Sequence, residues 1–200
     1  MIKFCIRILT AFLTSGIYLL LVRVYRIDPE FGNAAKSKRY LCLVIPALVL
    51  GFLNGNMIMV IPTDLLLFAS LTDGIMMQIY TLPCLISLAI GSVYSFLMVG
   101  VTEYIIYMAV VAVGSFALHA IKAINRGDVN LLIGIYPYLY ILGGNSGPDK
   151  MTIIACGYFI LTCIMALIIN LRGFLKGKKK FPFAIPALAA YSVMILMKGN

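Results

Sequence analysis

The chain has 200 residues, of which 62% are hydrophobic and only 12% are charged. Soluble domains are about half apolar and about a quarter charged, so this composition excludes a soluble domain and indicates a membrane protein. The apolar runs are continuous rather than alternating, which favours helices over an outer-membrane barrel. The net charge is +9, and the Lys and Arg residues cluster between apolar runs, as they do in cytoplasmic loops. Nucleic acid is therefore not an expected partner.

Eight apolar runs predict an all-α fold, a polytopic helical bundle of about eight transmembrane helices in one integral membrane domain over residues 1–200. The runs are 4–22, 41–53, 57–72, 82–100, 103–121, 129–143, 151–171 and 183–197. The stretch 40–72 is too long for one span and short for two. Asn54-Gly55-Asn56 is a suitable turn within it, because Asn and Gly tolerate left-handed backbone conformations. Seven spans, or a re-entrant 41–72, are the alternatives.

The basic clusters set an orientation for these spans. Lys and Arg gather at 23–39, 121–127 and 172–180, which we expect on the cytoplasmic side. Counting spans from these clusters puts Asp73 and Asp128 on that same face, one at the end of a helix and the other at the start of another. The basic stretch Lys176–Lys180 is expected to lie against anionic lipid.

A carboxylate at the mouth of a membrane helix is costly, so its default interpretation is a functional site. Two nearby carboxyls that share one proton can hydrolyse a peptide, because one takes a proton from water while the other polarises the carbonyl. Asp73 and Asp128 are therefore the candidate catalytic pair. Asp64, two residues after Pro62 in an apolar run, is the rival candidate, although it could also cap or complement the amino end of its helix.

Structural interpretations stand beside the catalytic one. Asp128 could be the N-cap of a helix over Val129–Leu142, and Asp73 could mark a helix exit. Gly127, without a Cβ, would let a substrate backbone approach closely and would free the turn that starts that helix.

Metal and cofactor sites are not expected. The five cysteines form no C-x-x-C pair, and the chain has a single histidine, His119, for which a packing or interfacial role is expected.

Three segments carry a family resemblance. Asn125-Arg126-Gly127-Asp128-Val129-Asn130-Leu131-Leu132 resembles the G-x-G-D-v-K-L-l segment of type IV prepilin peptidases, which are GxGD membrane aspartyl proteases. Ser70-Leu71-Thr72-Asp73, followed by Ile79-Tyr80-Thr81-Leu82-Pro83, is similar to the first aspartate segment of that family. Phe181-Pro182-Phe183-Ala184-Ile185-Pro186-Ala187 is similar to its late i-P-f-g-P segment, so the peptidase-like core covers 57–197.

The resemblance implies an aspartic-type endopeptidase of the plasma membrane. It would cut type IV prepilins or pseudopilins on the cytoplasmic side, within a type IV pilus or protein secretion system. Asp73 and Asp128 would be catalytic, with Gly127 and Asn130 supporting the site or contacting substrate. Asn125 stands where the family has its first glycine, and Asn130 stands where a lysine is usual.

Two further features bear on the function. The loop 23–39 has no cysteine, unlike the paired-cysteine loop of larger members, so no methyltransferase activity is expected. The alternatives to a peptidase are a catalytically inactive scaffold or assembly factor of the same fold and a small transporter. A transporter would place polar groups near the bilayer midplane.

Overall fold

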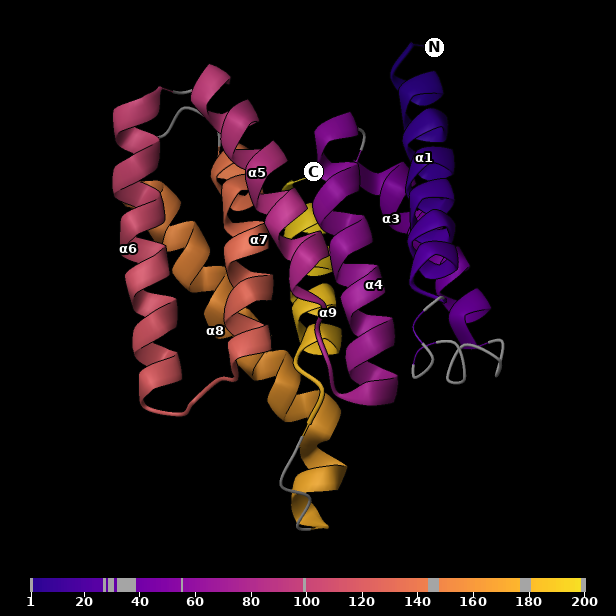
Figure 1. Cartoon of the computed structure of the whole chain (residues 1–200). Coiled ribbons are helices and arrows are strands. Elements are labelled where there is room, and N and C mark those ends of the chain that lie inside the picture. Colours follow the sequence, from indigo (N-terminus) through magenta and orange to yellow (C-terminus); the bar gives the residue numbers. More distant parts are fainter. Residues whose placement is uncertain are drawn as a thin grey trace. The chain divides into compact units, whose positions relative to one another are not determined.

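The computed structural model describes residues 2–26, 28, 31, 39–54, 56–98, 100–143, 148–176 and 181–198. Within these ranges the chain is all-α, with eight α-helices, two short 3-10 helices and no strand (Figure 1). The predicted fold class is therefore confirmed. Lys178–Lys180 of the predicted lipid-binding stretch, and most of 23–39, lie outside the described residues.

Five helical segments are long and apolar enough to cross a membrane. They are Ile2–Tyr25, Met57–Met76, Thr81–Met98, Val101–Ala120 and Lys150–Leu171. Two shorter apolar helices cover Tyr40–Asn54 and Ala184–Met197. The membrane class is thus supported by length and composition, whereas the number of crossings and their orientation stay predictions.

The contacts divide the chain into two compact units. Unit 1 comprises Met1–Gln78 and Met165–Asn200, and unit 2 comprises Ile79–Ile164. The boundaries fall between two adjacent residues of a short connection and within a continuous helix, α8 (Pro148–Leu175). The single membrane domain predicted over 1–200 stays a prediction.

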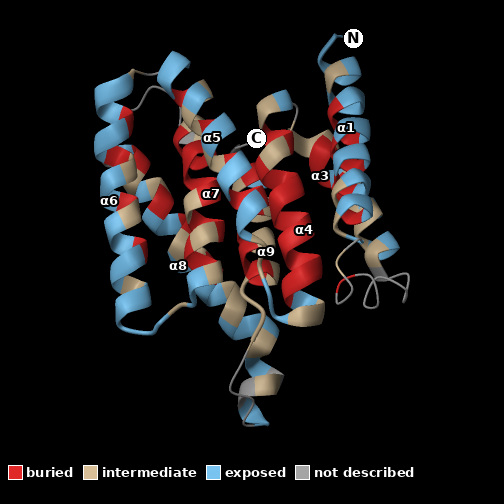
Figure 2. Cartoon of the chain, in the orientation of Figure 1, coloured by how far each residue is buried: buried red, intermediate tan, exposed pale blue. Residues whose placement is uncertain are grey.

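Unit 1 is built around α4 (Val60–Met76), which is buried from Val60 to Asp73 except at Ile61 (Figure 2). It packs against α1 (Ile2–Tyr25), α3 (Val44–Asn54) and α9 (Ala184–Lys198). The 3-10 helices η1 (Arg39–Leu43) and η2 (Met57–Met59) lead into α3 and α4. The helix break between α3 and η2 falls at the predicted turn, where the Asn56 side chain accepts a hydrogen bond from Ile58 N–H at 3.2 Å.

A seam of small side chains holds α1 to α3. Thr10, Thr14 and Ser15 are buried on one face of α1, where the Thr10 hydroxyl donates to the carbonyl of Gly51 at 2.7 Å. A Cβ on Gly51 would lie 2.7 Å from the Cα of Ala11. Small residues allow such close backbone approach, which is how membrane helices gain packing energy in the absence of water.

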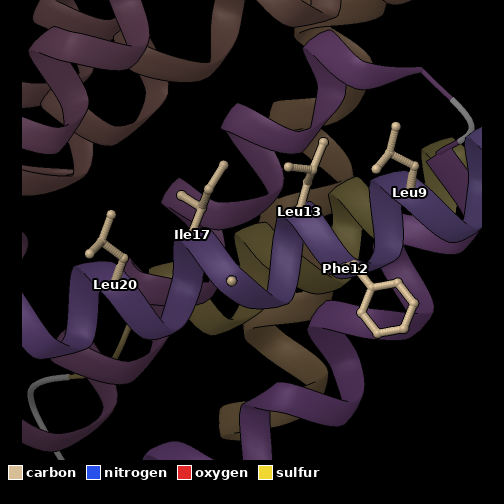
Figure 3. A pocket seen from close by; sticks show the side chains of 6 residues that line it. Leu9, Phe12, Leu13, Ile17 and Leu20 are labelled. Atoms are coloured by element: carbon tan, nitrogen blue, oxygen red, sulfur yellow. The ribbon is translucent and has the colours of Figure 1, made fainter.

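The opposite face of α1 is apolar and exposed. Leu9, Leu13, Ile17 and Leu20 project from one side of the helix and, with Phe12 and Gly16, line a shallow groove (Figure 3). A Cβ on Gly16 would meet nothing within 4 Å. This face has the composition of a surface turned toward lipid tails.

Unit 2 is built around α7 (Arg126–Gly143), whose residues 134–140 are all buried. It packs against α5 (Thr81–Met98) and α6 (Val101–Ala120). Pro137 removes one backbone donor from α7, and side chains of the neighbouring helices bond to α7 carbonyls close to it. The Ser87 hydroxyl donates to the carbonyl of Gly134 at 2.8 Å, and the Tyr107 hydroxyl donates to that of Tyr136 at 2.9 Å. Such side-chain donors satisfy backbone groups that lipid cannot.

Candidate functional site

Asp73 lies in the last turn of α4 and is 5% exposed. Its Oδ2 accepts a hydrogen bond from the backbone N–H of Ala184, the first residue of α9, at 2.8 Å. The amino end of a helix presents unpaired N–H groups and a positive dipole end, both of which favour a carboxylate. Asp73 therefore caps α9, a helix more than a hundred positions away in the sequence.

A second bond fixes the same junction. Ser70, one turn before Asp73, donates its hydroxyl to the carbonyl of Ala184 at 3.0 Å. A Cβ on Gly74 would lie 3.2 Å from Cδ1 of Ile185, so α4 and α9 approach closely there. The segment Ser70–Asp73 and the segment Phe181–Ala187 of the family resemblance thus meet within unit 1. Ser70 and Ala184 belong to these segments, but nothing in the sequence indicated that they bond to each other.

The end of α4 lies beyond the end of the apolar run 57–72. The helix continues through Asp73 and Gly74 to Met76, and Met77 closes it in a left-handed conformation with its N–H bonded to the carbonyl of Asp73. Asp73 thus lies in the last turn of α4, at the helix end as predicted, while the helix runs to Met76 because a helix does not stop where its apolar run stops.

Asp128 is the third residue of α7 and is 7% exposed. Its Oδ2 accepts from the backbone N–H of Asn125 at 2.8 Å, while the carbonyl of Asn125 accepts the first helical bond, from Val129 N–H, at 3.1 Å. Asn125 is therefore the N-cap, and Asp128 supplies the backward bond of a capping box. The prediction of Asp128 as the N-cap itself is wrong by three residues.

This geometry gives a physical reason for one departure from the family pattern. Asn is among the favoured N-cap residues, and Asn125 occupies that position. Gly127 lies inside the first turn of α7, the turn that it is expected to free.

Gly127 and Asn130 both face the stretch that follows Asp73 in the chain. A Cβ on Gly127 would lie 3.3 Å from the Cβ of Ile79. The Asn130 amide donates to the hydroxyl of Thr81 at 3.2 Å, at an exposed position. The segment Asn125–Leu132 thus packs on residues 79–81, and both stretches belong to unit 2.

The two candidate aspartates belong to different units, Asp73 to unit 1 and Asp128 to unit 2. Each is described by the contacts of its own unit. They share two features: each lies on the buried central helix of its unit, and each has an Oδ2 bound by a backbone N–H at a helix amino end.

Asp64, the rival candidate, is 2% exposed in the first half of α4. Neither of its carboxyl oxygens has a hydrogen-bond partner among the described residues. The expectation that Asp64 caps its helix is therefore wrong, and Met59 occupies the N-cap position without a side-chain bond. Pro62 does lie in the first turn, as predicted.

Metal ligands do not gather in the part of the chain that the structure describes, where no three His, Cys, Asp or Glu side chains form a cluster that could hold an ion. Nδ1 of His119 lies 3.0 Å from the carbonyl of Ile124, at the exposed end of α6. The described cysteines are thiols, and Cys84 alone among them is buried.

Comparisons of the chain with family models, with curated proteins and with solved structures find no match.

Proposed function

We propose that this chain is an intramembrane aspartyl endopeptidase that cleaves the leader of type IV prepilins or pseudopilins at the cytoplasmic face of the plasma membrane. Asp73 and Asp128 are its catalytic pair. The proposal rests on the resemblance of three segments to the prepilin peptidases and on the surroundings of the two acids.

One observation carries the catalytic assignment. Each acid lies on the buried central helix of its unit with one carboxylate oxygen bound by a backbone N–H, at 2.8 Å in both cases. A carboxylate bound in this way is held in a fixed orientation, and fixed orientation is what a catalytic group needs to act in a near-attack geometry.

Contacts made by the three resembling segments support the same assignment. The third segment provides the N–H that binds Asp73, and the stretch after Asp73 packs on Gly127. Residues that are far apart in sequence but belong to one pattern are thus in contact within each unit. A chance match of short motifs would not require such contacts.

In the proposed reaction the two carboxyls share one proton. The ionised carboxylate removes a proton from a water molecule while that water attacks the scissile carbonyl. The protonated carboxyl donates its proton to the carbonyl oxygen. The roles belong to the pair and are not assigned to Asp73 or Asp128 individually. The substrate implied by the resemblance has a short basic leader before an apolar helix.

The test is cleavage of a prepilin-like substrate co-reconstituted with the protein in liposomes, comparing wild type with Asp73→Asn and Asp128→Asn. Asparagine keeps an acceptor oxygen for the N–H of Ala184 or Asn125, so these variants remove the acid while retaining the cap. Both should lower the cleavage rate by at least about 10²-fold, the usual contribution of general acid–base catalysis.

Glu103→Gln is the matched control, because it removes an exposed carboxylate from the first turn of α6 and should cleave at the wild-type rate. Wild-type rates in both aspartate variants would refute the mechanism. Loss of cleavage in Asp64→Asn but not in Asp73→Asn would make Asp64, and not Asp73, a member of the catalytic pair. An inactive wild type with a folded structure would favour the scaffold.

A further inference from the structure

We propose that Asp64 is a cation-binding site inside unit 1, at which the carboxyl group holds a proton or a small monovalent cation such as Na⁺. The site is separate from the proposed peptidase pair and does not depend on it.

Asp64 has an unusual position for a carboxyl group. It is 2% exposed within the apolar span Met57–Met76, and neither oxygen has a hydrogen-bond partner among the described residues. The hydroxyl of the adjacent Thr63 has no proton left to donate to the Asp64 carboxyl. It already donates to the carbonyl of Met59 at 2.7 Å and accepts from the Asn54 amide at 2.8 Å.

The elements packed against α4 do not supply a described counter-charge. They are α1, α3, α9, η1 and η2, of which α3 and η2 have no titratable side chain. The titratable or charged side chains described on the other three are Lys3, Cys5, Arg7, Tyr18, Arg23, Tyr25, Tyr40, Cys42 and Tyr191.

The groups in this set are either exposed or engaged elsewhere. Lys3 and Arg23 are exposed, and the guanidinium of Arg7 lies over the ring of Phe52 at 6.0 Å. The buried Tyr18 donates to the carbonyl of Tyr40 at 2.9 Å. On α9, the hydroxyl of Tyr191 donates to the sulfur of Met59 at 3.7 Å. Within the described residues, then, protein groups do not neutralise Asp64.

Because the described residues supply no counter-charge, a bound cation would stabilise this side chain. A buried carboxylate without a partner costs several kcal/mol, even after relaxation of the surroundings. That cost is comparable with the whole stability of a typical domain, about 5–15 kcal/mol. A proton or a monovalent ion matches the single charge of one carboxylate, whereas a divalent ion carries twice that charge.

The test is infrared difference spectroscopy of the full-length protein in liposomes, with wild type compared to Asp64→Asn over a range of pH, with and without Na⁺. Without Na⁺, wild type should show the carbonyl stretching band of a protonated carboxylic acid, and Asp64→Asn should lack it. Asp73→Asn should retain the band, which separates this site from the proposed peptidase pair.

The salt arm identifies the cation. A band lost on addition of Na⁺ at constant pH identifies sodium, and a band that only alkaline pH removes identifies the proton. A wild-type carboxyl that titrates as an exposed aspartate does, with no response to Na⁺, would overturn the proposal. If Asp64→Asn does not fold, Asp64→Leu, which replaces the carboxyl with an apolar side chain, serves as the reference. Cleavage is not the readout, so an inactive peptidase would leave this result interpretable.

Discussion

The contact between α1 and α3 allows a quantitative test of the packing in unit 1. A methyl group added by Gly51→Ala would lie 2.7 Å from the Cα of Ala11, 2.7 Å from Oγ1 of Thr14 and 2.8 Å from the carbonyl oxygen of Thr10. Two of these three atoms are backbone, so the two helices must separate to admit it. We expect this variant to weaken the α1–α3 pair.

The matched control is Gly16→Ala, whose methyl group meets nothing within 4 Å. Both glycines lie inside helices, so the gain in helix preference from Gly to Ala cancels between the two variants. What remains is overpacking, about 1–3 kcal/mol, and the weakened Thr10–Gly51 bond, about 0.6 kcal/mol for a membrane hydrogen bond. Gly51→Ala should therefore be less stable than Gly16→Ala by about 1.5–3.5 kcal/mol.

Steric trapping measures this difference. Biotin tags placed on α1 and α3 can both bind streptavidin only when the two helices separate, so the second binding event reports the separation equilibrium. The expected difference corresponds to about one to two and a half powers of ten in that equilibrium. Equal stability of the two variants, or a more stable Gly51→Ala, would refute the close packing of these helices.

Two further predictions concern unit 2. Gly91→Ala should open the α5–α7 contact and increase maleimide labelling of the buried Cys84 by roughly 10- to 100-fold, since its Cβ would lie 2.7 Å from Pro137. Gly114→Ala, whose Cβ meets nothing within 4 Å, should leave that labelling unchanged, and equal labelling in both variants would contradict the packing. Asn130→Ala removes only an exposed hydrogen bond and should change the free energy of unfolding, measured by SDS titration, by no more than about 0.5 kcal/mol.

The helical segments and the break at Asn54–Asn56 were predictable from sequence, because apolar runs and turn residues encode them locally. Helix ends were less predictable. The α7 helix begins at Arg126 and α4 continues to Met76, since polar residues that cap or end a helix do not count toward an apolar run. The division into two units was also hidden, because one of its boundaries falls inside the continuous helix α8.

The candidate site could be named from sequence as a set of residues but not as a set of contacts. Short motifs identified Asp73, Asp128 and the segment around Ala184 as related. Their bonds depend on tertiary structure, as between Asp73 and Ala184, which lie 111 positions apart. The sequence also could not predict that Asp64 has no hydrogen-bond partner among the described residues. An acid in an apolar run can cap a helix, pair with another group or stand alone, and the local pattern is the same in each case.

The cap that Asp73 provides to α9 has a consequence for biosynthesis. Unit 2 is one continuous stretch, whereas unit 1 joins an early stretch of the chain to a late one. The backbone N–H that binds Asp73 is synthesised 111 residues after it, which at ribosomal speed is a delay of roughly 5 to 20 s. During that interval the Asp73 carboxylate lacks the bond that orients it. A nascent chain thus acquires this bond only after α9 has been synthesised, although α4 and its carboxylate are made much earlier.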